Sequence, residues 1–512
     1  MLSSCGGRVG GPVIFYVVDT LRPDRMSTYG AERETSPAAT RLASEGVLFR
    51  NAYTLSSWTR PAIATLLTSR LPSDVGALNR FGRLSEKVPY LPEIFRKHGW
   101  PTGAAVGNGN VDDERLGFRR GFDHFDAVWG EGGDGKPFAE EVVARALAFV
   151  ASQRSPKFFL YVHVIDPHSP YKIPSRFRDS FGGSPVGAQR DALLLEYDRT
   201  IRTSDAAFER LVASLEARGW WQSALAVYLS DHGEEFFEHG ALYHGATLYE
   251  EQTRVPLVVK YPGNVERGSV RSDPVTLADV MPTVAEMMGW KAERAWIGES
   301  FWKRRFSPNR EIYGTEDLDK VRMYSLRRGP EKVIVSLYPS FDRRYFRLDR
   351  DRGETDGAPM PCGAVLPPAS DLVSRVESWR SRDLAHFPQT RFVKRPGENV
   401  RIDLAVQLKG IPKPFLTAAD LCRLGSVTDG DSLLLREPVS RAGRLDLRIS
   451  ASDRGVLPPY RLSVTDEQGR PIALGVGRGV TVFSEPGDFM AGPTADQAML
   501  RRLRALGYLG GN

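Results

Sequence analysis

Apolar runs and amphipathic stretches alternate along the chain from residue 12 to about residue 290. Residues 13–18 (VIFYVV) and 225–229 (LAVYL) contain no charged side chain, which is typical of strands buried on both faces of a sheet. Residues 196–219 instead repeat apolar side chains at helical spacing, so they predict an amphipathic helix that leads into the second strand. Strand and helix patterns in this order predict an α/β fold with a mainly parallel sheet.

Polar side chains follow both predicted strands. Asp19 comes directly after the first strand, and Asp231 and His232 come shortly after the second. In an open α/β sheet, ligands bind outside the carboxyl ends of the strands, so we expect these side chains to meet at one edge. A third segment places Thr59 on a turn before a helix of small residues, and we expect its hydroxyl at the same edge.

This combination indicates a metal-assisted nucleophile. A threonine hydroxyl attacks poorly at neutral pH unless a base or a metal favours its alkoxide. Asp19, Asp231 and His232 offer hard oxygens and one imidazole nitrogen, and the Thr59 oxygen is a fourth ligand. The set suits one Mn²⁺, Zn²⁺ or Mg²⁺ ion, whereas Ca²⁺ fits the nitrogen less well.

Each of these residues also has a structural interpretation. An Asp after an apolar strand often caps a helix, and a Thr two residues before Pro61 can do the same. His163 lies on an apolar strand and is interpreted as a core residue. His239 is interpreted as a structural residue or as a partner of the site's ligands.

Several motifs resemble, in order, those of the sulfatase family within the alkaline phosphatase superfamily. They are residues 18–24 (VDTLRPD), 163–171 (HVIDPHSPY), 230–234 (SDHGE), 245–251 (GATLYEE) and 503–509 (LRALGYL). The resemblance covers roughly residues 12 to 360. It implies an alkaline phosphatase-like fold, in which helices flank the mainly parallel sheet and a small antiparallel sheet follows.

The resemblance also assigns roles opposite the metal. His168 and His244 bind the anionic oxygens of the substrate or protonate its leaving group. Sulfatases usually have Lys at the position of His244, so the histidine favours metal binding or proton transfer. Arg60 follows the nucleophile and is a candidate contact for a negative group. Asn108 and Asn110 align with a substrate-binding Lys and His of sulfatases.

Two departures from the family change the expected chemistry. Sulfatases oxidise a Cys or Ser to formylglycine in a motif with Pro two and Arg four residues later, where this chain has Thr59, Pro61 and Ile63. They also usually carry two adjacent acids where this chain has Asp19 and Thr20. A single Asp with a Thr nucleophile resembles the phosphoester and phosphonate branches of the superfamily instead.

A second metal ion is the alternative to a single one. Superfamily phosphatases hold a second ion with one Asp and two His, and Asp166, His168 and His244 are the candidates here. The short Asp-Pro-His spacing differs from the spacing of those enzymes, so one ion is favoured.

Residues beyond about 310 predict further units. Strand patterns continue with turn signals between them, and the segment from 386 resembles no part of the family, so it predicts a β-sandwich-like accessory domain. This domain would brace the catalytic domain or bind a glycan or partner. The predicted organisation is a leader at 1–11, a catalytic α/β domain at 12–310, an antiparallel subdomain at 311–385, the accessory β domain at 386–486, and a helix and tail at 487–512.

The first residues resemble a lipobox. Residues 2–7 (LSSCGG) match the site at which bacterial lipoproteins are cleaved and acylated, with Cys5 as the lipid anchor. No charged or apolar segment precedes Cys5, so the anchor requires a start codon upstream. In that case we expect a lipoprotein of the periplasm or cell envelope, and otherwise a cytoplasmic protein. No segment reaches the roughly 20 apolar residues that span a bilayer.

Composition narrows the expected partners. A net charge of +6 fits anionic substrates. The sequence has no basic block with interleaved aromatic residues, which is the pattern that would indicate nucleic-acid binding. Three cysteines are too few for a disulfide framework.

Together these features predict a metal-dependent hydrolase in which Thr59 attacks phosphate or phosphonate (di)esters, with sulfate esters less favoured. If an alcohol replaces water, the same site becomes a transferase of phosphoglycerol or phosphoethanolamine onto a lipid or glycan. A catalytically silent, glycan-binding relative is the remaining alternative.

Overall fold

The computed structural model describes most of residues 9–359 and short segments beyond them. The gaps in the first range are 79–81, 113, 130–134, 183–188, 319–320 and 339–341; the later segments are 372, 375–376, 391–393, 407–408, 445–448, 461–465, 471–472 and 482–483.

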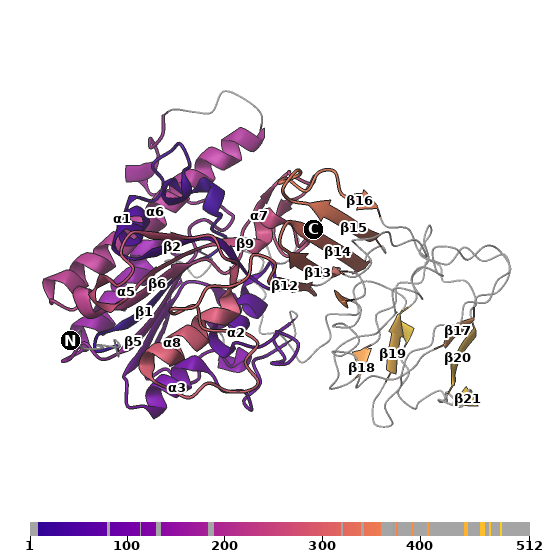
Figure 1. The fold of residues 1–512 in the computed structure, drawn as a ribbon, viewed down its shortest axis with the longest axis horizontal. Helices are drawn as coiled ribbons and strands as arrows, with labels where there is room; N and C mark the ends of the chain where they lie inside the picture. Colours follow the sequence, from indigo (N-terminus) through magenta and orange to yellow (C-terminus); the bar gives the residue numbers. More distant parts are fainter. Residues whose placement is uncertain are drawn as a thin grey trace.

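A nine-stranded sheet forms the centre of the fold (Figure 1). Its main path runs β10-β2-β9-β6-β1-β5-β3-β4, and β11 pairs with β2 beside β10. Only β9 runs antiparallel to its neighbours among these described strands. The predicted, mainly parallel α/β sheet is therefore confirmed. The strand bounds are β1 Val13–Val18, β2 Val47–Tyr53, β3 Thr102–Val106, β4 His124–Ala127, β5 Phe159–Val164, β6 Leu225–Leu229, β9 Arg254–Lys260, β10 Ser269–Arg271 and β11 Val275–Thr276.

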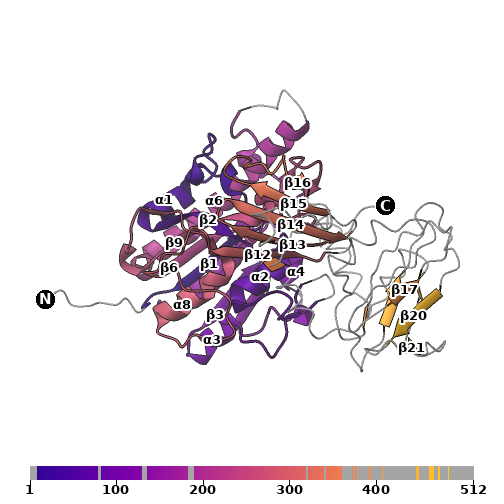
Figure 2. The ribbon, with the colours of Figure 1, turned by 45° about the vertical axis from the view of Figure 1, so that its right-hand side comes forward.

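Helices cover both faces of this sheet (Figures 1 and 2). Alternate residues of β1 face opposite sides, as Phe15 and Tyr16 show by packing in two different apolar cores. The core of Tyr16 contains α1 (Pro37–Glu45), α5 (Ala139–Ser152) and α6 (Gln189–Ala217); the core of Phe15 contains α2 (Thr59–Thr68), α3 (Leu91–Lys97) and α8 (Val280–Met288). The central strands β1 and β6 are therefore apolar throughout because each face is buried.

The predicted amphipathic helix is present as α6, although it begins at Gln189, several residues before the predicted start. Among the described helices, none is both long enough and apolar enough to cross a membrane.

A five-stranded antiparallel sheet follows the large sheet and confirms the predicted small sheet. The backbone N–H of Thr315, in its first strand, donates to the carbonyl oxygen of Leu55 at 2.8 Å, so this strand touches the segment that leads to α2. The strands are β12 Glu311–Glu316, β13 Arg322–Arg328, β14 Glu331–Tyr338, β15 Asp342–Arg347 and β16 Ala358–Pro359.

Short strands are also described in the predicted accessory domain. They form two three-stranded sheets, β17-β20-β21 and β18-β19-β22. Their bounds are β17 Arg391–Val393, β18 Gln407–Leu408, β19 Leu445–Arg448, β20 Arg461–Thr465, β21 Pro471–Ile472 and β22 Val482–Phe483. The helix and tail predicted at 487–512 and the predicted anchor at Cys5 lie outside the described residues. The sandwich and the domain boundaries stay predictions.

The junction between α1 and β2 gives a test of packing. A Cβ added to Gly46 would lie 2.3 Å from the carbonyl oxygen of Val259 and 2.7 Å from the Cα of Lys260, both in the backbone of β9. Because backbone atoms of a central strand cannot move aside cheaply, Gly46→Ala should cost about 1–3 kcal/mol and lower the melting temperature by several degrees. In the control Gly10→Ala, the added Cβ meets no described atom within 4 Å. Equal melting temperatures for the two variants would contradict this packing.

Candidate functional site

The structure brings Asp19, Thr59, Asp231 and His232 together at the carboxyl edge of the large sheet. Asp19 follows β1, Asp231 and His232 follow β6, and Thr59 is the first residue of α2. Thr59 Oγ1 lies 3.5 Å from Asp19 Oδ2 and 3.3 Å from His232 Nε2. His232 Nε2 lies 3.4 Å from Asp231 Oδ2 and 3.8 Å from Asp19 Oδ1. All four residues are completely buried.

A strained turn holds Asp19 in this place. Thr20 has φ +57°, a left-handed conformation that is costly for a β-branched residue. Its N–H donates to Asp231 Oδ1 at 3.3 Å, and its carbonyl oxygen accepts from the Tyr197 hydroxyl at 2.6 Å. The next N–H, that of Leu21, donates to Ser230 Oγ at 2.9 Å. These bonds tie the end of β1 to the end of β6, so both carboxylates stay at a fixed separation.

The residues fit a divalent metal ion. Within the described residues, neither Asp19 Oδ1 nor Asp231 Oδ2 has a hydrogen-bond partner, although both are buried. His232 Nδ1 donates to the carbonyl oxygen of Gly233 at 3.0 Å, which leaves a lone pair on Nε2 toward the carboxylates. The ligand atoms of Asp19, Asp231 and His232 all lie within 4.8 Å of one another. Two carboxylate oxygens and one imidazole nitrogen in a buried site are ligands that suit such a cation.

The ionisation of the two carboxylates supports this fit. Burial and the charge of Asp19 raise the pKa of Asp231. Burial alone would also raise the pKa of Asp19, but the hydrogen bond from His163 and the nearby imidazoles of His168 and His232 outweigh it and lower this pKa. Two like charges this close are unfavourable without a positive partner. A divalent cation removes that cost.

Asn108 lies against Thr59. It follows β3, and its Nδ2 donates to Thr59 Oγ1 at 3.1 Å and also to Asp19 Oδ2. Its Oδ1 accepts from the backbone N–H of Asn110 at 2.7 Å, which fixes the orientation of the amide. The predicted contacts of Asn108 and Asn110 with substrate stay predictions.

Arg60 is completely buried beside the nucleophile. Its Nη1 donates to the carbonyl oxygen of Gly82 at 3.1 Å, and its Nε donates to that of Asn110 at 3.4 Å. Its guanidinium lies 5.4 Å from the ring of Trp58. These contacts hold the loop around α2 together, and a contact of Arg60 with substrate stays a prediction.

His168 and His244 lie next to each other beside the metal ligands. Their ring centroids are 4.8 Å apart, and the ring of His244 is 4.4 Å from that of His232. Burial lowers the pKa of His168 to about 3 and that of His244 to about 4, so both rings are neutral at neutral pH. The Nδ1 of His244 lies 2.9 Å from Oε1 of Glu234, which orients the ring. Because His168 Nδ1 donates to the carbonyl oxygen of Ser169, the Nε2 of this neutral ring carries a lone pair and accepts rather than donates.

The geometry for a second ion is weaker. Among the described residues, Asp166, His168 and His244 do not form a group whose ligand atoms lie within 4.8 Å of one another. The segment is held instead by the buried Lys136, which donates to the carbonyl oxygens of Asp166, His168 and Pro170. The second ion stays a prediction.

Sequence reasoning missed two residues of this site. His163, interpreted as a core residue, has its Nε2 3.3 Å from Asp19 Oδ2 and 3.9 Å from Asp231 Oδ2. The sequence signal that could have placed His163 in this site is its position near the carboxyl end of an apolar strand. Glu316 of β12 accepts hydrogen bonds at its Oε2 from Ser57 N at 3.0 Å and Ser57 Oγ at 2.7 Å, two residues before Thr59. No local pattern indicates this contact because the partners are far apart in sequence.

Comparison with known proteins places the chain in a family. The model of the sulfatase family matches residues 12–290. The ulvan-active sulfatase of Formosa agariphila is 25% identical over 342 residues, which cover 58% of this chain and 66% of that protein. The chain spans between 60% and 66% of the length of the first curated relatives that it matches.

Solved structures agree on the fold. BT4656 in complex with its substrate D-glucosamine-2-N,6-O-disulfate matches with a TM-score of 0.61 at 17% identity, over 73% of this chain and 98% of that one. The phosphonate monoester hydrolase of Agrobacterium radiobacter matches with a TM-score of 0.60 at 17% identity, over 75% of this chain and 98% of that one. At these identities the likeness concerns the fold alone.

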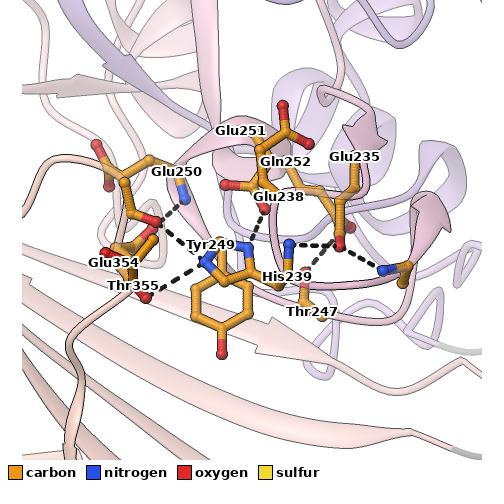
Figure 3. A network of polar contacts seen from close by, with 12 residues as sticks. Glu235, Glu238, His239, Thr247, Tyr249, Glu250, Glu251, Gln252, Glu354 and Thr355 are labelled. Atoms are coloured by element: carbon orange, nitrogen blue, oxygen red, sulfur yellow. Dashed lines mark hydrogen bonds and ion pairs between the residues drawn. The ribbon is translucent and has the colours of Figure 1, made fainter. Parts of the chain in front are cut away.

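A second histidine–carboxylate cluster lies beside this site (Figure 3). It contains Glu235, His239 and Glu251. Glu235 Oε1 accepts from the backbone N–H of His239 at 3.1 Å, and its Oε2 accepts from Gln252 at 3.0 Å. His239 Nδ1 lies 2.9 Å from Glu251 Oε1, and its Nε2 lies 3.1 Å from the carbonyl oxygen of Gly353. Because both ring nitrogens face acceptors, the ring satisfies both contacts only as an imidazolium.

His239 therefore links the part of the chain built on the nine-stranded sheet to the segment after β15, in agreement with its structural interpretation. Burial alone would lower its pKa, but the hydrogen bond and charge of Glu251 raise it above the ordinary value. The ring also stacks on Tyr249, with centroids 3.5 Å apart, where a cation on the aromatic face is favoured.

The raised pKa predicts a pH-dependent stability. The contribution of His239 is fully present below the ordinary histidine pKa and is lost as pH rises through the raised folded pKa. His239→Gln should therefore lower the melting temperature at pH 6, and the difference from wild type should shrink toward pH 9. Differential scanning calorimetry at both pH values measures this. His98→Gln, at an exposed histidine after α3, is the control, and a pH-independent difference for His239→Gln would contradict the imidazolium.

Proposed function

The chain belongs to the sulfatase family, and from this premise we propose that it is a metal-dependent hydrolase of phosphodiesters and phosphonate monoesters with Thr59 as nucleophile. One observation carries the proposal. Thr59 Oγ1 lies within 3.5 Å of both Asp19 and His232, beside buried carboxylate oxygens that suit a metal ion.

The surroundings of Thr59 favour negative charge on its oxygen. Thr59 begins α2, where the helix dipole and the first backbone N–H groups stabilise anions. Asn108 Nδ2 donates to Thr59 Oγ1 and stabilises the oxygen further as it loses its proton. A divalent ion held by Asp19, Asp231 and His232 would lower the pKa of the hydroxyl and neutralise charge on the phosphoryl oxygens.

The balance of charges supports monoanionic substrates. Asn108 is neutral, and burial keeps His168 and His244 neutral at neutral pH. These residues add no positive charge for a compact dianion such as a phosphate monoester. Phosphodiesters, phosphonate monoesters and sulfate esters are all monoanions. Threonine then disfavours the sulfate ester, because it cannot form the formylglycine that sulfatases use.

The proposed reaction has two displacements. The Thr59 oxygen attacks phosphorus, the bond from phosphorus to the ester oxygen breaks, and the leaving alcohol takes up a proton. A water molecule then attacks phosphorus, the bond to the Thr59 oxygen breaks, and Thr59 regains its proton. His168 and His244 lie beside the ligands, where the lone pair of His168 Nε2 can accept a hydrogen bond from the attacking water. An acceptor alcohol in place of water would give the transferase reaction.

Turnover of matched p-nitrophenyl esters tests the nucleophile and the substrate class. The panel contains phosphodiester, phenylphosphonate, phosphate and sulfate esters, each with Mn²⁺, Zn²⁺, Mg²⁺ or Ca²⁺ added separately. We expect cleavage of the diester and the phosphonate, and a loss of at least roughly a thousandfold in Thr59→Ala. Thr68→Ala, in the last turn of the same helix, is the matched control and should keep full activity.

Three outcomes would change this proposal. An active Thr59→Ala protein rules out the nucleophile. Sulfate cleavage that depends on Thr59 rules out the proposed substrate class. Silence on every ester by a protein that binds metal supports transfer to an acceptor or a binding role.

Metal content gives an independent prediction. Protein stripped with chelator and titrated with Mn²⁺ or Zn²⁺ should bind one equivalent, measured by elemental analysis after gel filtration. Asp231→Asn should lose this ion because it removes one of the two charged ligands. Glu235→Gln, in the cluster of Figure 3, should keep it. Two equivalents in wild type would support the second site at Asp166, His168 and His244 instead.

A further inference from the structure

His163 occupies a position that a packing role does not explain. It lies in β5, in register with Val17 of β1, and its side chain is completely buried. Its Nε2 faces Asp19 Oδ2 at 3.3 Å and Asp231 Oδ2 at 3.9 Å. A polar ring nitrogen directed at two carboxylates inside the protein is costly unless it interacts with them.

A tyrosine determines which ring nitrogen carries hydrogen. The Tyr161 hydroxyl lies 2.9 Å from His163 Nδ1. Carboxylate oxygens only accept, so the nitrogen that faces them must be the donor. The neutral ring fits both contacts when Tyr161 donates to Nδ1 and Nε2–H faces Asp19 Oδ2, which is 3.3 Å away but outside the alignment of a hydrogen bond. Tyr161, which is two residues earlier on the same strand, therefore fixes both the tautomer and the orientation of the ring.

The two oxygens of Asp19 consequently have different surroundings. Oδ2 accepts from Asn108 and faces His163 Nε2, and it is also the oxygen near Thr59. Oδ1 has no hydrogen-bond partner among the described residues and faces His232. One oxygen is thus held by the protein, and the other is left for a ligand.

We propose that His163 is a positioning residue of the metal site, which holds Asp19 through Oδ2 so that Oδ1 is directed at the ion. The Tyr161 hydroxyl in turn orients the ring of His163 through its contact with Nδ1. The inference rests on the metal site of the proposed function and adds to it the residues that orient its first carboxylate. Partners of this kind raise metal affinity because the ligand no longer loses conformational freedom when the ion binds.

The tautomer argues against His163 as a direct ligand. A metal ligand needs a lone pair, whereas the nitrogen of His163 that faces the carboxylates carries hydrogen. The group of candidate ligand atoms contains Asp19, Asp231 and His232 and does not include His163.

Metal affinity of the full chain tests this role without using activity. Competition with a chromophoric chelator gives the Kd for Zn²⁺ and Mn²⁺ in wild type and variants. We expect His163→Leu to weaken binding by about 10–100-fold at unchanged 1:1 stoichiometry. His163→Gln, which keeps an N–H donor at a similar reach, should recover most of this loss. Tyr161→Phe should weaken binding by a smaller factor, whereas Tyr16→Phe, at a buried tyrosine that bonds to Ser204, should not change it.

X-ray absorption of the Zn²⁺-loaded proteins separates positioning from ligation. The number of nitrogen ligands should be the same in wild type and in His163→Leu. A nitrogen lost in His163→Leu, or an unchanged Kd in both His163→Leu and Tyr161→Phe, would overturn the proposal while the metal site stands. If the wild-type protein binds no ion, both this proposal and the proposed function fail. If His163→Leu does not fold, Tyr161→Phe and His163→Gln carry the test.

Discussion

The repulsion between the carboxylates of Asp19 and Asp231 is the constraint on which the rest of the site depends. Both are completely buried at neighbouring strand ends, and each has one oxygen without a hydrogen-bond partner among the described residues. Water cannot screen their charges there, so a cation or a proton must compensate them. The strained turn at Thr20 and its bond to Tyr197 hold the pair in place against this repulsion. Binding of a cation therefore relieves a cost that folding has already imposed.

One amide connects Thr59 to this pair. Thr59 receives a hydrogen bond from Asn108, which also binds Asp19, so a single side chain holds both residues. Two buried imidazoles, His168 and His244, stand beside the ligands without adding charge. These two rings therefore add no fixed positive charge to the site.

Much of this arrangement could be predicted from the sequence, for a physical reason. Carboxyl ends of parallel strands share one edge, so Asp19 and Asp231 had to meet once their strands were recognised. The role of His163 could not be predicted in the same way. Its strand is buried on both faces, so an apolar pattern cannot show that its neighbour across the sheet ends in a carboxylate. The contact of Glu316 with Ser57 joins distant segments and leaves no local pattern at all.

That last contact determines how small a working protein of this kind can be. The family match ends at residue 290, yet the carboxylate that receives the N–H and the hydroxyl of Ser57 comes from the first strand of the small sheet. A fragment trimmed to the matched region would remove the carboxylate that these donors bind two residues before Thr59. The first strand of the small sheet thus supports the segment that carries Thr59, and any minimal version of this site has to extend at least through Glu316.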